Sequence, residues 1–323
     1  MNTLKLAATS RQDLQTAAQL LQQGKRVALP TETVYGLAAD ATQPDAVKGI
    51  FAAKGRPANH PLIVHIGDIA QLSEWVESVS EDALTLAKTF WPGPLTLLLK
   101  KSTSCNSVVT GGLETVAVRI PSHPVMLSLL QKHRLAVAAP SANLYKQLSP
   151  TNADQVLDGL DGRIEAVVDG GDCLFGLEST IVDLTSEAIQ VLRAGPITAH
   201  QLSECLGKPV TYPESHNVAV PGNVGSHYQP QTLLRLVGSL SQSLEQRDRS
   251  LTYAVLHTTA FAEEANVHSL AMPLDAQEYG NKLYRYLAKA DKLKVDEIWL
   301  EQPPTGEEWN AIHDRLSRAA LPL

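Results

Sequence analysis

The segment RVALPTETVYGLAAD, residues 26–40, joins a short apolar run to a polar turn and indicates the kind of fold. RVAL at 26–29 is typical of a buried strand. The turn that follows gathers hydroxyl groups and a carboxylate, while Pro30 fixes φ and Gly36 allows close backbone approach. Ligands of α/β proteins collect where strands end, so this turn is a candidate binding loop. An ordinary structural turn explains the segment, taken alone, equally well.

Strand-like and helix-like segments alternate on both sides of this stretch. The sequence predicts further strands at 62–66, 95–99, 116–120 and 135–139, and helices at 11–23, 44–53, 81–90 and 124–132. Three short strands between residues 165 and 193 then follow without long helices, which favours a mixed sheet over a purely parallel one. We therefore predict an α/β fold with a twisted mixed sheet.

The composition changes after residue 207. Residues 208–232 are rich in Pro, Gly, Ser and Asn and lack helical periodicity, which indicates a linker or a long loop. We predict a first domain at 1–207, this linker, and a smaller C-terminal α/β domain at 233–323 with helices at 276–293 and 306–318.

The charge balance restricts what the protein can bind. Its 323 residues include 27 Lys and Arg against 34 Asp and Glu, a net charge of −7. Gripping a nucleic-acid backbone over a broad surface needs clustered cations, so any anion site must be a local pocket.

The cysteines and the apolar runs exclude further classes. Cys105, Cys173 and Cys205 form no C-x-x-C pair, which argues against a structural zinc site and indicates free thiols. No apolar run approaches the ~20 residues of a spanning helix, and the first residues lack an apolar signal core. We expect a cytoplasmic protein without a membrane segment. With no coiled-coil seam, a monomer is the default expectation.

Common nucleotide-binding and hydrolase motifs are absent. The sequence contains no P-loop, no G-x-G-x-x-G after a strand, no G-x-S-x-G and no H-E-x-x-H. Candidate residues must therefore come from the polar loops between the predicted elements.

Four cations stand in or beside these loops. Lys54 and Arg56 lie in KGRPANHPL at 54–62, Arg119 lies on an apolar strand, and Arg193 ends another strand. Arg119 needs an anionic partner, which could be a structural carboxylate or a ligand carboxylate. Together the four would form a basic cleft whose positive electrostatic potential attracts an anionic substrate.

Hydroxyl and amide groups provide further candidates. APSANLYKQLSPT at 139–151 contains Ser141, Asn143 and Ser149, and Ser179 precedes a strand. Turn capping explains each of these alone. His65, inside a strand, is by itself more typical of a core histidine than of a ligand.

Six of these segments, in this order, carry a family resemblance. They are PTETVYGLAAD, KGRP followed by PLIVHI, WPGPLTLLL at 91–99, VAVRIPSHP at 116–124, APSAN at 139–143 and LESTIVD at 177–183. Over residues 10–200 the sequence resembles the YrdC-type threonylcarbamoyl-AMP synthases. HYQP at 227–230 and the small domain after it resemble the longer, two-domain form of that family.

The resemblance implies a reaction. L-threonine and bicarbonate give a carbamate, the carbamate attacks the α-phosphate of ATP, and pyrophosphate leaves. The product, threonylcarbamoyl-AMP, serves partner proteins that form N6-threonylcarbamoyladenosine (t6A) beside the anticodon of tRNA. The enzyme would use Mg²⁺ with few protein ligands, no protein metal site is expected, and direct tRNA binding would be weak or absent.

The resemblance also implies roles for residues. Lys54 and Arg56 would be catalytic. L-threonine would be bound by Thr33, His65, Arg119, Ala139 through its backbone, and Ser179. ATP would be bound by Arg56, His60, Thr115, Ser141, Asn143, Ser149, Arg193 and, from the linker, Tyr228. The family usually has asparagine at the position of His60. The linker would close over the nucleotide as a lid.

Two other functions stay open at this point. One is an RNA-binding module of the same fold, against which the net charge argues. The other is carbamoyl transfer, since hydrogenase-maturation carbamoyltransferases contain a related domain. Those proteins look much longer and carry zinc-finger cysteine pairs.

Overall fold

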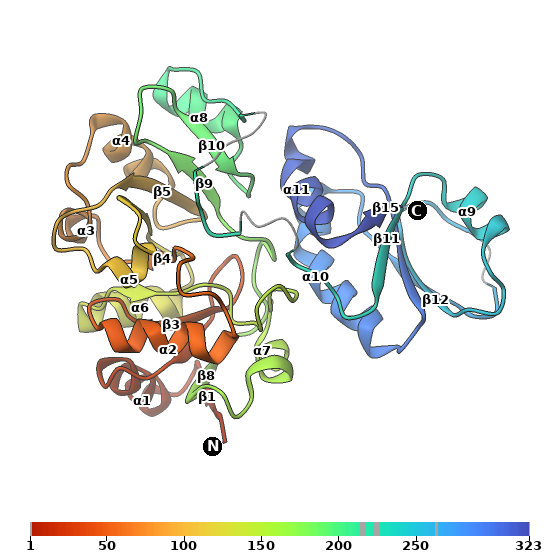
Figure 1. The fold of residues 1–323 in the computed structure, drawn as a ribbon, viewed down its shortest axis with the longest axis horizontal. Helices are drawn as coiled ribbons and strands as arrows, with labels where there is room; N and C mark the ends of the chain where they lie inside the picture. Colours follow the sequence, from red (N-terminus) through yellow and green to blue (C-terminus); the bar gives the residue numbers. More distant parts are fainter. Residues whose placement is uncertain (1, 214–217, 223–226, 262–263, 323) are drawn as a thin grey trace.

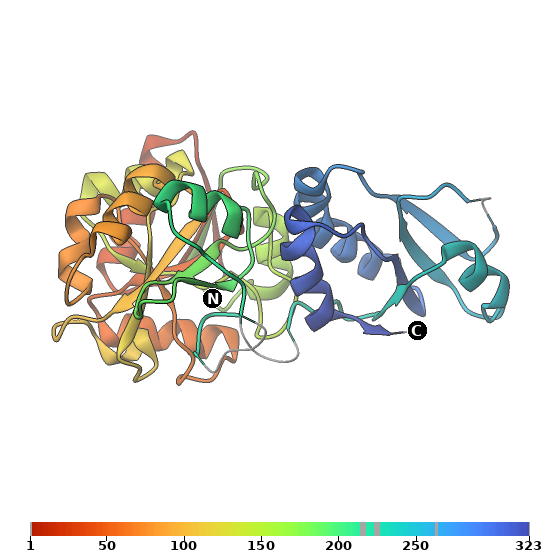
Figure 2. The same cartoon turned by 90° about the horizontal axis from the view of Figure 1, so that it is seen from above.

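A computed structural model describes residues 2–213, 218–222, 227–261 and 264–322 of the chain. It contains a ten-stranded sheet formed by the first two-thirds of the chain and a five-stranded sheet formed by the last third. The two sheets and their helices lie side by side along the long axis of the molecule (Figure 1, Figure 2).

The first sheet is mixed, as the sequence predicts. It contains both parallel and antiparallel pairs, for example β4 with β6 (parallel) and β5 with β6 (antiparallel). Its strands, in spatial order, are β1 (Leu4–Ala7), β8 (Ala166–Asp169), β2 (Val27–Leu29), β3 (Gly36–Asp40), β7 (Val137–Ala138), β4 (Ile63–His65), β6 (Thr115–Arg119), β5 (Leu95–Lys100), β9 (Thr180–Asp183) and β10 (Gln190–Arg193).

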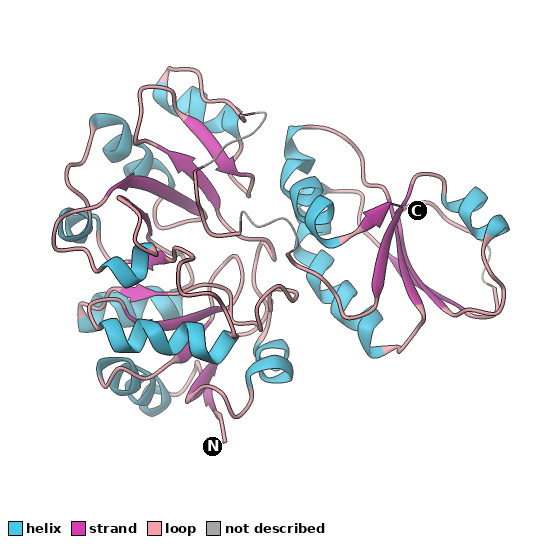
Figure 3. Ribbon diagram, in the orientation of Figure 1, coloured by secondary structure: helices cyan, strands magenta, loops and turns pink. Residues whose placement is uncertain are grey.

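Helices cover this sheet on the outside (Figure 3). They are α1 (Arg11–Gln22), α2 (Pro44–Lys54), η1 (Ile69–Gln71), α3 (Leu72–Trp75), α4 (Glu81–Phe90), α5 (Ser107–Thr110), α6 (Pro124–His133), α7 (Ala153–Leu160) and α8 (Ala199–Leu206). The predicted helices at 11–23, 44–53, 81–90 and 124–132 correspond to α1, α2, α4 and α6.

One sequence expectation needs correction. The second half of the 30–40 loop, Gly36–Asp40, forms strand β3, which pairs antiparallel with β2 and so turns the loop into a hairpin. The three strands expected between 165 and 193 form as β8, β9 and β10, and β8 lies between β1 and β2 at the far side of the sheet. Only β9 and β10 pair directly.

The second sheet is entirely parallel between the pairs of strands described. Its order is β13 (Val267–Ala271), β12 (Tyr253–His257), β14 (Glu297–Glu301), β11 (Leu233–Val237) and β15 (Leu321–Pro322). Its helical elements are α9 (Leu240–Gln246), α10 (Ala276–Lys292), η2 (Glu307–Trp309) and α11 (Asn310–Ala319). Of these, α10 and α11 face the first domain (Figure 1).

Helix α2 illustrates how local sequence places a polar residue. Pro44 opens the helix, where a missing N–H is harmless. Gly55 ends it with φ of 63°, a left-handed conformation that glycine adopts without penalty. The reversal leaves Lys54 buried in the last helical turn and Arg56 on the loop beyond it. Across the described part of the chain, no helix is long and apolar enough to cross a membrane.

Candidate active site

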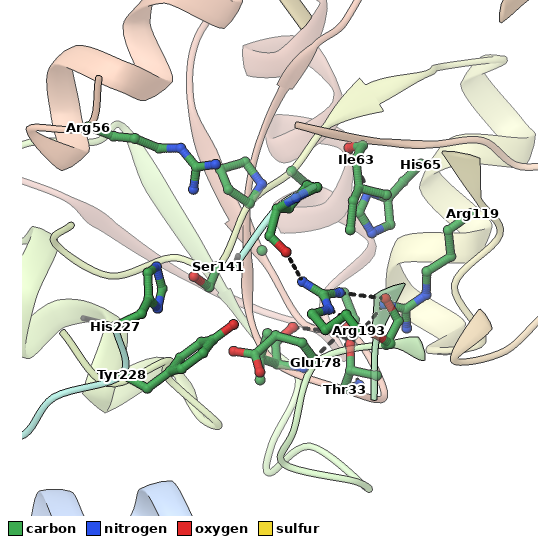
Figure 4. Close-up of a pocket in the computed structure, with 18 residues that line it drawn as sticks. Thr33, Arg56, Ile63, His65, Arg119, Ser141, Glu178, Arg193, His227 and Tyr228 are labelled. Carbon is green, nitrogen blue, oxygen red and sulfur yellow. Dashed lines mark hydrogen bonds between the residues drawn. The ribbon is translucent and has the colours of Figure 1, made fainter. Parts of the chain in front are cut away.

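A cavity lies where loops after several strands of the first sheet meet the linker, with about 540 Å³ of empty space when the part open to solvent is included. Figure 4 shows its side chains converging from both sides. The lining residues are Thr31, Thr33, Val34, Gly36, Arg56, Ile63, His65, Arg119, Ala139, Pro140, Ser141, Glu178, Ser179, Arg193, Pro221, Gly222, His227 and Tyr228.

Arg119, on β6, is the most buried arginine that lines the cavity, and it is paired with an equally buried carboxylate. Its Nη2 lies 2.6 Å from Oε1 of Glu32, and both side chains are at most 4% exposed. Its Nε donates to the carbonyl of Gly93 at 3.1 Å, and its Nη1 donates to Oγ1 of Thr33 at 3.0 Å. The partner that the sequence requires is therefore a structural carboxylate.

The Glu32 carboxylate is not fully satisfied by this pair. The contact with Arg119 is close but not aligned as a hydrogen bond, and both oxygens lack a hydrogen-bond donor among the described residues. Thr31, beside it, orders the loop by donating to the carbonyl of Val34 at 2.6 Å.

His65, on β4, presents a neutral imidazole to the cavity. Burial lowers its pKa to about 3, and the charge of Arg119 adds to that effect. Its Nδ1 lies 3.3 Å from the carbonyl of Ile63, which can only accept, so Nδ1 carries the proton. The unprotonated Nε2 is then available as a hydrogen-bond acceptor.

Arg193 joins β10 to β9 and to the linker. Its Nε donates to the carbonyl of Ser179, its Nη2 donates to Oγ of Ser179, and its Nη1 donates to the carbonyl of Pro221, each at 3.0 Å. The Ser179 hydroxyl also lies 2.7 Å from Oγ1 of Thr96. One arginine thus links the strand ends to the segment that covers the cavity.

Arg56 borders this cavity and a neighbouring one that is also lined by His60. Its Nη2 donates to the carbonyl of Pro61 at 3.0 Å, while its Nε is buried with no hydrogen-bond partner among the described residues. Burial lowers its pKa to about 10, so it stays charged at neutral pH. An unpaired N–H on a partly buried cation is suited to an anionic ligand.

Lys54 lies behind the cavity wall. Its Nζ donates to the carbonyls of Ser141 and Asn143 and lies 3.4 Å from Oδ1 of Asn143. Asn143 in turn donates from Nδ2 to the carbonyls of Leu144 and Gln147, each at 2.8 Å. Lys54 and Asn143 therefore shape the 141–147 loop from inside, instead of facing the cavity as the sequence analysis expects.

Glu178 is the carboxylate of the opposite wall. Its Oε1 accepts from Ser149 at 2.5 Å, and its Oε2 accepts from Tyr284 at 3.1 Å and from Arg315 at 2.7 Å. Burial acts to raise its pKa, but the charges of Arg315 and Arg193 outweigh burial and hold the pKa at about 2. Glu178 is consequently ionised, and Ser149 is engaged with it.

Aromatic rings form a line beside the cavity. His60 contacts Tyr145, Tyr145 contacts His227, and His227 contacts Tyr228, with ring centroids 5.6, 6.2 and 4.1 Å apart. Tyr228 then stacks on Tyr284 of α10 at 5.8 Å. The line runs from the 54–62 loop through the linker to the second domain.

The structure brings most, but not all, of the expected residues together. Those that line the main cavity are Thr33, Arg56, His65, Arg119, Ala139, Ser141, Ser179, Arg193 and Tyr228. The N–H of Ala139 already donates to the carbonyl of Ile63, so a backbone contact with a ligand falls to its carbonyl. Thr115, at the start of β6, pairs with Lys100 and lines neither cavity.

Sequence reasoning misses several groups of the site. Glu32 and Glu178 stand inside quoted motifs without an assigned role, and Tyr145 and His227 lie beside residues that were singled out. A carboxylate inside an apolar motif, as in LESTIVD, is the signal that could have identified Glu178.

The donor set does not fit a dedicated metal site. No group of three or more His, Cys, Asp or Glu able to hold a metal ion occurs within the described ranges. The two cavity carboxylates, Glu32 and Glu178, are each paired with an arginine.

Fold and site together define an α/β enzyme whose cleft is lined by arginines and hydroxyl groups, and the described lining residues include no nucleophile held by a base. Residues 19–195 match the Sua5–YciO–YrdC family model, described as "Telomere recombination", and residues 197–321 match the model "Threonylcarbamoyl-AMP synthase, C-terminal domain". The chain belongs to the Sua5–YrdC family in its two-domain form.

Similar proteins support this assignment over almost the whole chain. A threonylcarbamoyl-AMP synthase of Pyrococcus abyssi is 37% identical, over 95% of this chain and 94% of its own. One from Bacillus subtilis is 39% identical, over 97% and 94%. The crystal structure of P. abyssi Sua5 complexed with L-threonine superposes with a TM-score of 0.90 at 33% identity and covers both chains fully. The family and the fold class predicted from the sequence are confirmed.

Proposed function

We propose that this chain condenses L-threonine, bicarbonate and ATP into threonylcarbamoyl-AMP and pyrophosphate, the donor for the t6A modification of tRNA. One observation carries the proposal: two groups of cation and hydroxyl, around Arg119 and around Arg56 and Arg193, share one cavity. An amino-acid carboxylate and a nucleotide phosphate are the anions that such a pair of groups accommodates.

The threonine side of the cavity would consist of Thr33, His65, Arg119, Ala139 and Ser179. The outer N–H groups of Arg119 suit the amino-acid carboxylate, with Glu32 holding the guanidinium in place. The unprotonated Nε2 of His65 suits a donor on threonine, such as its amine or its hydroxyl. This arrangement fixes the amine at the centre of the cavity.

The nucleotide side would use Arg56, His60, Ser141, Arg193 and Tyr228. Arg56 offers an unpaired N–H, and Arg193 carries its charge beside the linker. We propose that Lys54, Asn143 and Ser149 act indirectly, since their polar groups are engaged within the protein. Thr115 keeps only the role that the family resemblance implies.

The family resemblance implies two bond-forming steps in this cavity. The free amine of threonine attacks bicarbonate, giving the carbamate with loss of water. A carbamate oxygen then attacks the α-phosphorus, the bond to the β-phosphate oxygen breaks, and pyrophosphate leaves with the electron pair. Fixed cations stabilise the charge that develops, without covalent catalysis.

The resemblance also implies Mg²⁺, which would neutralise phosphate charge. Since the described residues offer no carboxylate cage, its ligands would be phosphate oxygens and water, as Mg²⁺ often retains. We further propose a cytoplasmic monomer that passes its product to threonylcarbamoyl-transfer proteins and binds tRNA weakly or not at all. The net charge of −7 supports the last point.

The linker would act as a lid that protects the labile carbamate and the mixed anhydride. Pro221, Gly222, His227 and Tyr228 of the linker line the cavity, while residues 214–217 and 223–226 lie outside the described residues. Deleting residues 215–230 should lower the rate and shorten the lifetime of the intermediate. An unchanged rate and lifetime would exclude a lid.

Pyrophosphate release from ATP and Mg²⁺, with L-threonine and bicarbonate omitted in turn, tests the function. Release that requires both supports the proposal. Release that ignores threonine would favour the carbamoyl-transfer alternative, and no release together with salt-dependent RNA binding would favour an RNA-binding module.

A further inference from the structure

An arginine of the second domain is completely buried behind the wall of the cavity, against two residues that line it. Arg315, on α11, has no exposed surface, although arginine is almost never fully buried without a partner. Its Nε donates to Oε2 of Glu178 at 2.7 Å, and its Nη2 contacts the carbonyl of the same residue at 3.4 Å. Asp314 accepts from its Nη1.

The same guanidinium supports the linker. Its central carbon lies 5.3 Å from the ring centroid of Tyr228, a cation–π contact. Tyr284 of α10 stacks on the same ring and donates its hydroxyl to Glu178. Two helices of the second domain therefore meet one linker residue and one wall residue.

The conformation of Tyr228 shows why it needs this support. Its φ of 61° lies in the left-handed region, which costs a non-glycine residue about 1–2 kcal/mol. Such conformations persist where the surroundings over-determine them, and they gather at functional sites. Arg315, Tyr284 and His227 all contact this ring.

We propose that Arg315 is a positioning residue for the nucleotide side of the cavity, so that the second domain completes the active site. It holds Glu178 and Tyr228 in place, and Glu178 in turn fixes Ser149. On the threonine side, the polar contacts described for Arg119 and His65 are all with residues of the first domain. This inference rests on the proposed function.

Replacing Arg315 should therefore affect the two substrates differently. Arg315→Met should raise the KM for ATP at least tenfold in the pyrophosphate-release assay, while the affinity for L-threonine alone, measured by calorimetry, changes less than twofold. Arg315→Lys keeps the charge beside Glu178 but loses the planar fork, so it should recover part of the ATP affinity.

A double variant tests whether Arg315 acts through Glu178. Glu178→Gln alone should also raise the KM for ATP, and Glu178→Gln with Arg315→Met should be no worse than the stronger single variant. Additive losses would overturn the proposed route through Glu178.

A second pair between the domains provides the matched control. Arg285 of α10 bonds Asp172 at 2.9 Å, with both side chains partly exposed and neither lining the main cavity. Arg285→Met should leave both substrate constants unchanged. An equal loss in Arg285→Met and Arg315→Met, or an equal effect of Arg315→Met on both substrates, would make Arg315 a docking contact only.

The outcomes also separate this inference from the proposed function. If the unaltered protein releases pyrophosphate only with threonine and bicarbonate, but Arg315→Met behaves like it, the positioning role fails and the synthase function stands. If the unaltered protein shows no such release, the function itself fails.

Discussion

Arg119 and Glu32 form an ion pair inside the cavity wall, with Nη2 2.6 Å from Oε1 and hardly any surface of either side chain exposed. A buried pair gains little net stability over an apolar pair, but losing one partner leaves an uncompensated charge. Because Arg119 is also the proposed partner of the substrate carboxylate, one residue carries both a structural and a binding role. These two roles can be separated.

Arg119→Met should lower the free energy of unfolding by about 3–5 kcal/mol, since it leaves the buried Glu32 carboxylate without its charged partner. Denaturant unfolding measures this loss. Adding Glu32→Gln should restore part of the stability, while calorimetry should still detect no threonine binding. A double variant that binds threonine normally would remove Arg119 from the binding site.

The pKa of His65 gives a pH dependence of stability. Burial, with the charge of Arg119, lowers that pKa to about 3, whereas the unfolded chain takes up the proton near pH ~6.5. The unfolded state therefore binds more protons in this window, and stability falls as the pH drops from about 6.5 to about 3.

His65→Gln should reduce that slope by up to about 1.4 kcal/mol per pH unit, measured by denaturant unfolding between pH 6.5 and 4. Burial also lowers the pKa of His227 to about 3, so His227→Gln should reduce the slope by a similar amount. An unchanged slope in His65→Gln would mean that its imidazole is protonated in the folded protein.

Lys54 and Arg56 are close in sequence, but replacing them should have different effects on stability and on ATP binding. Lys54→Gln removes the donor shared by two backbone carbonyls and should lower stability by about 1.5–3 kcal/mol, as well as weaken ATP binding. Arg56→Gln should raise the KM for ATP at least tenfold. Its free energy of unfolding should stay within about 0.5 kcal/mol of that of the unaltered protein. Thermal unfolding and ATP titration on both variants check the contrast. Equal stability losses would contradict it.

The linker packing can be tested at a glycine. Gly222 has φ of 86°, and a Cβ there would overlap the hydroxyl of Tyr228. Gly222→Ala should therefore displace Tyr228 and reduce pyrophosphate release several-fold.

Gly112 is the matched control for this substitution, because it has the same φ of 86° with nothing near its Cβ position. Gly112→Ala should lower the free energy of unfolding by only ~1 kcal/mol, the cost of an unfavourable backbone conformation, and leave pyrophosphate release unchanged. Equal activity in the two alanine variants would show that the position of Tyr228 does not matter for turnover.

Local patterns predict most of the first domain. Apolar runs such as 95–99 and 116–120 become β5 and β6, because a strand buried on both faces needs little beyond continuous hydrophobicity. GLAAD at 36–40 was assigned to a loop, since small residues without alternation carry a weak strand signal. Its pairing with β2 and β7 comes from the tertiary structure.

The site is predicted where its residues belong to motifs and is missed where long-range contacts decide. Arg119, His65 and Arg193 follow from the family resemblance, whereas Arg315 lies in NAIHDRLSRA, which is typical of a solvated helix face. Its burial depends on Glu178, 137 residues away in the sequence. No local pattern contains that information.

The same separation has a consequence during synthesis. A nascent chain emerges from its N-terminus, so the LESTIVD strand leaves the ribosome long before α11 exists. Until then, the Glu178 carboxylate has neither Arg315 nor Tyr284 beside it, and Tyr228 lacks the contacts that hold its left-handed backbone. The proposed nucleotide side of the cavity should therefore be completed last, after the sheet that carries the proposed threonine side.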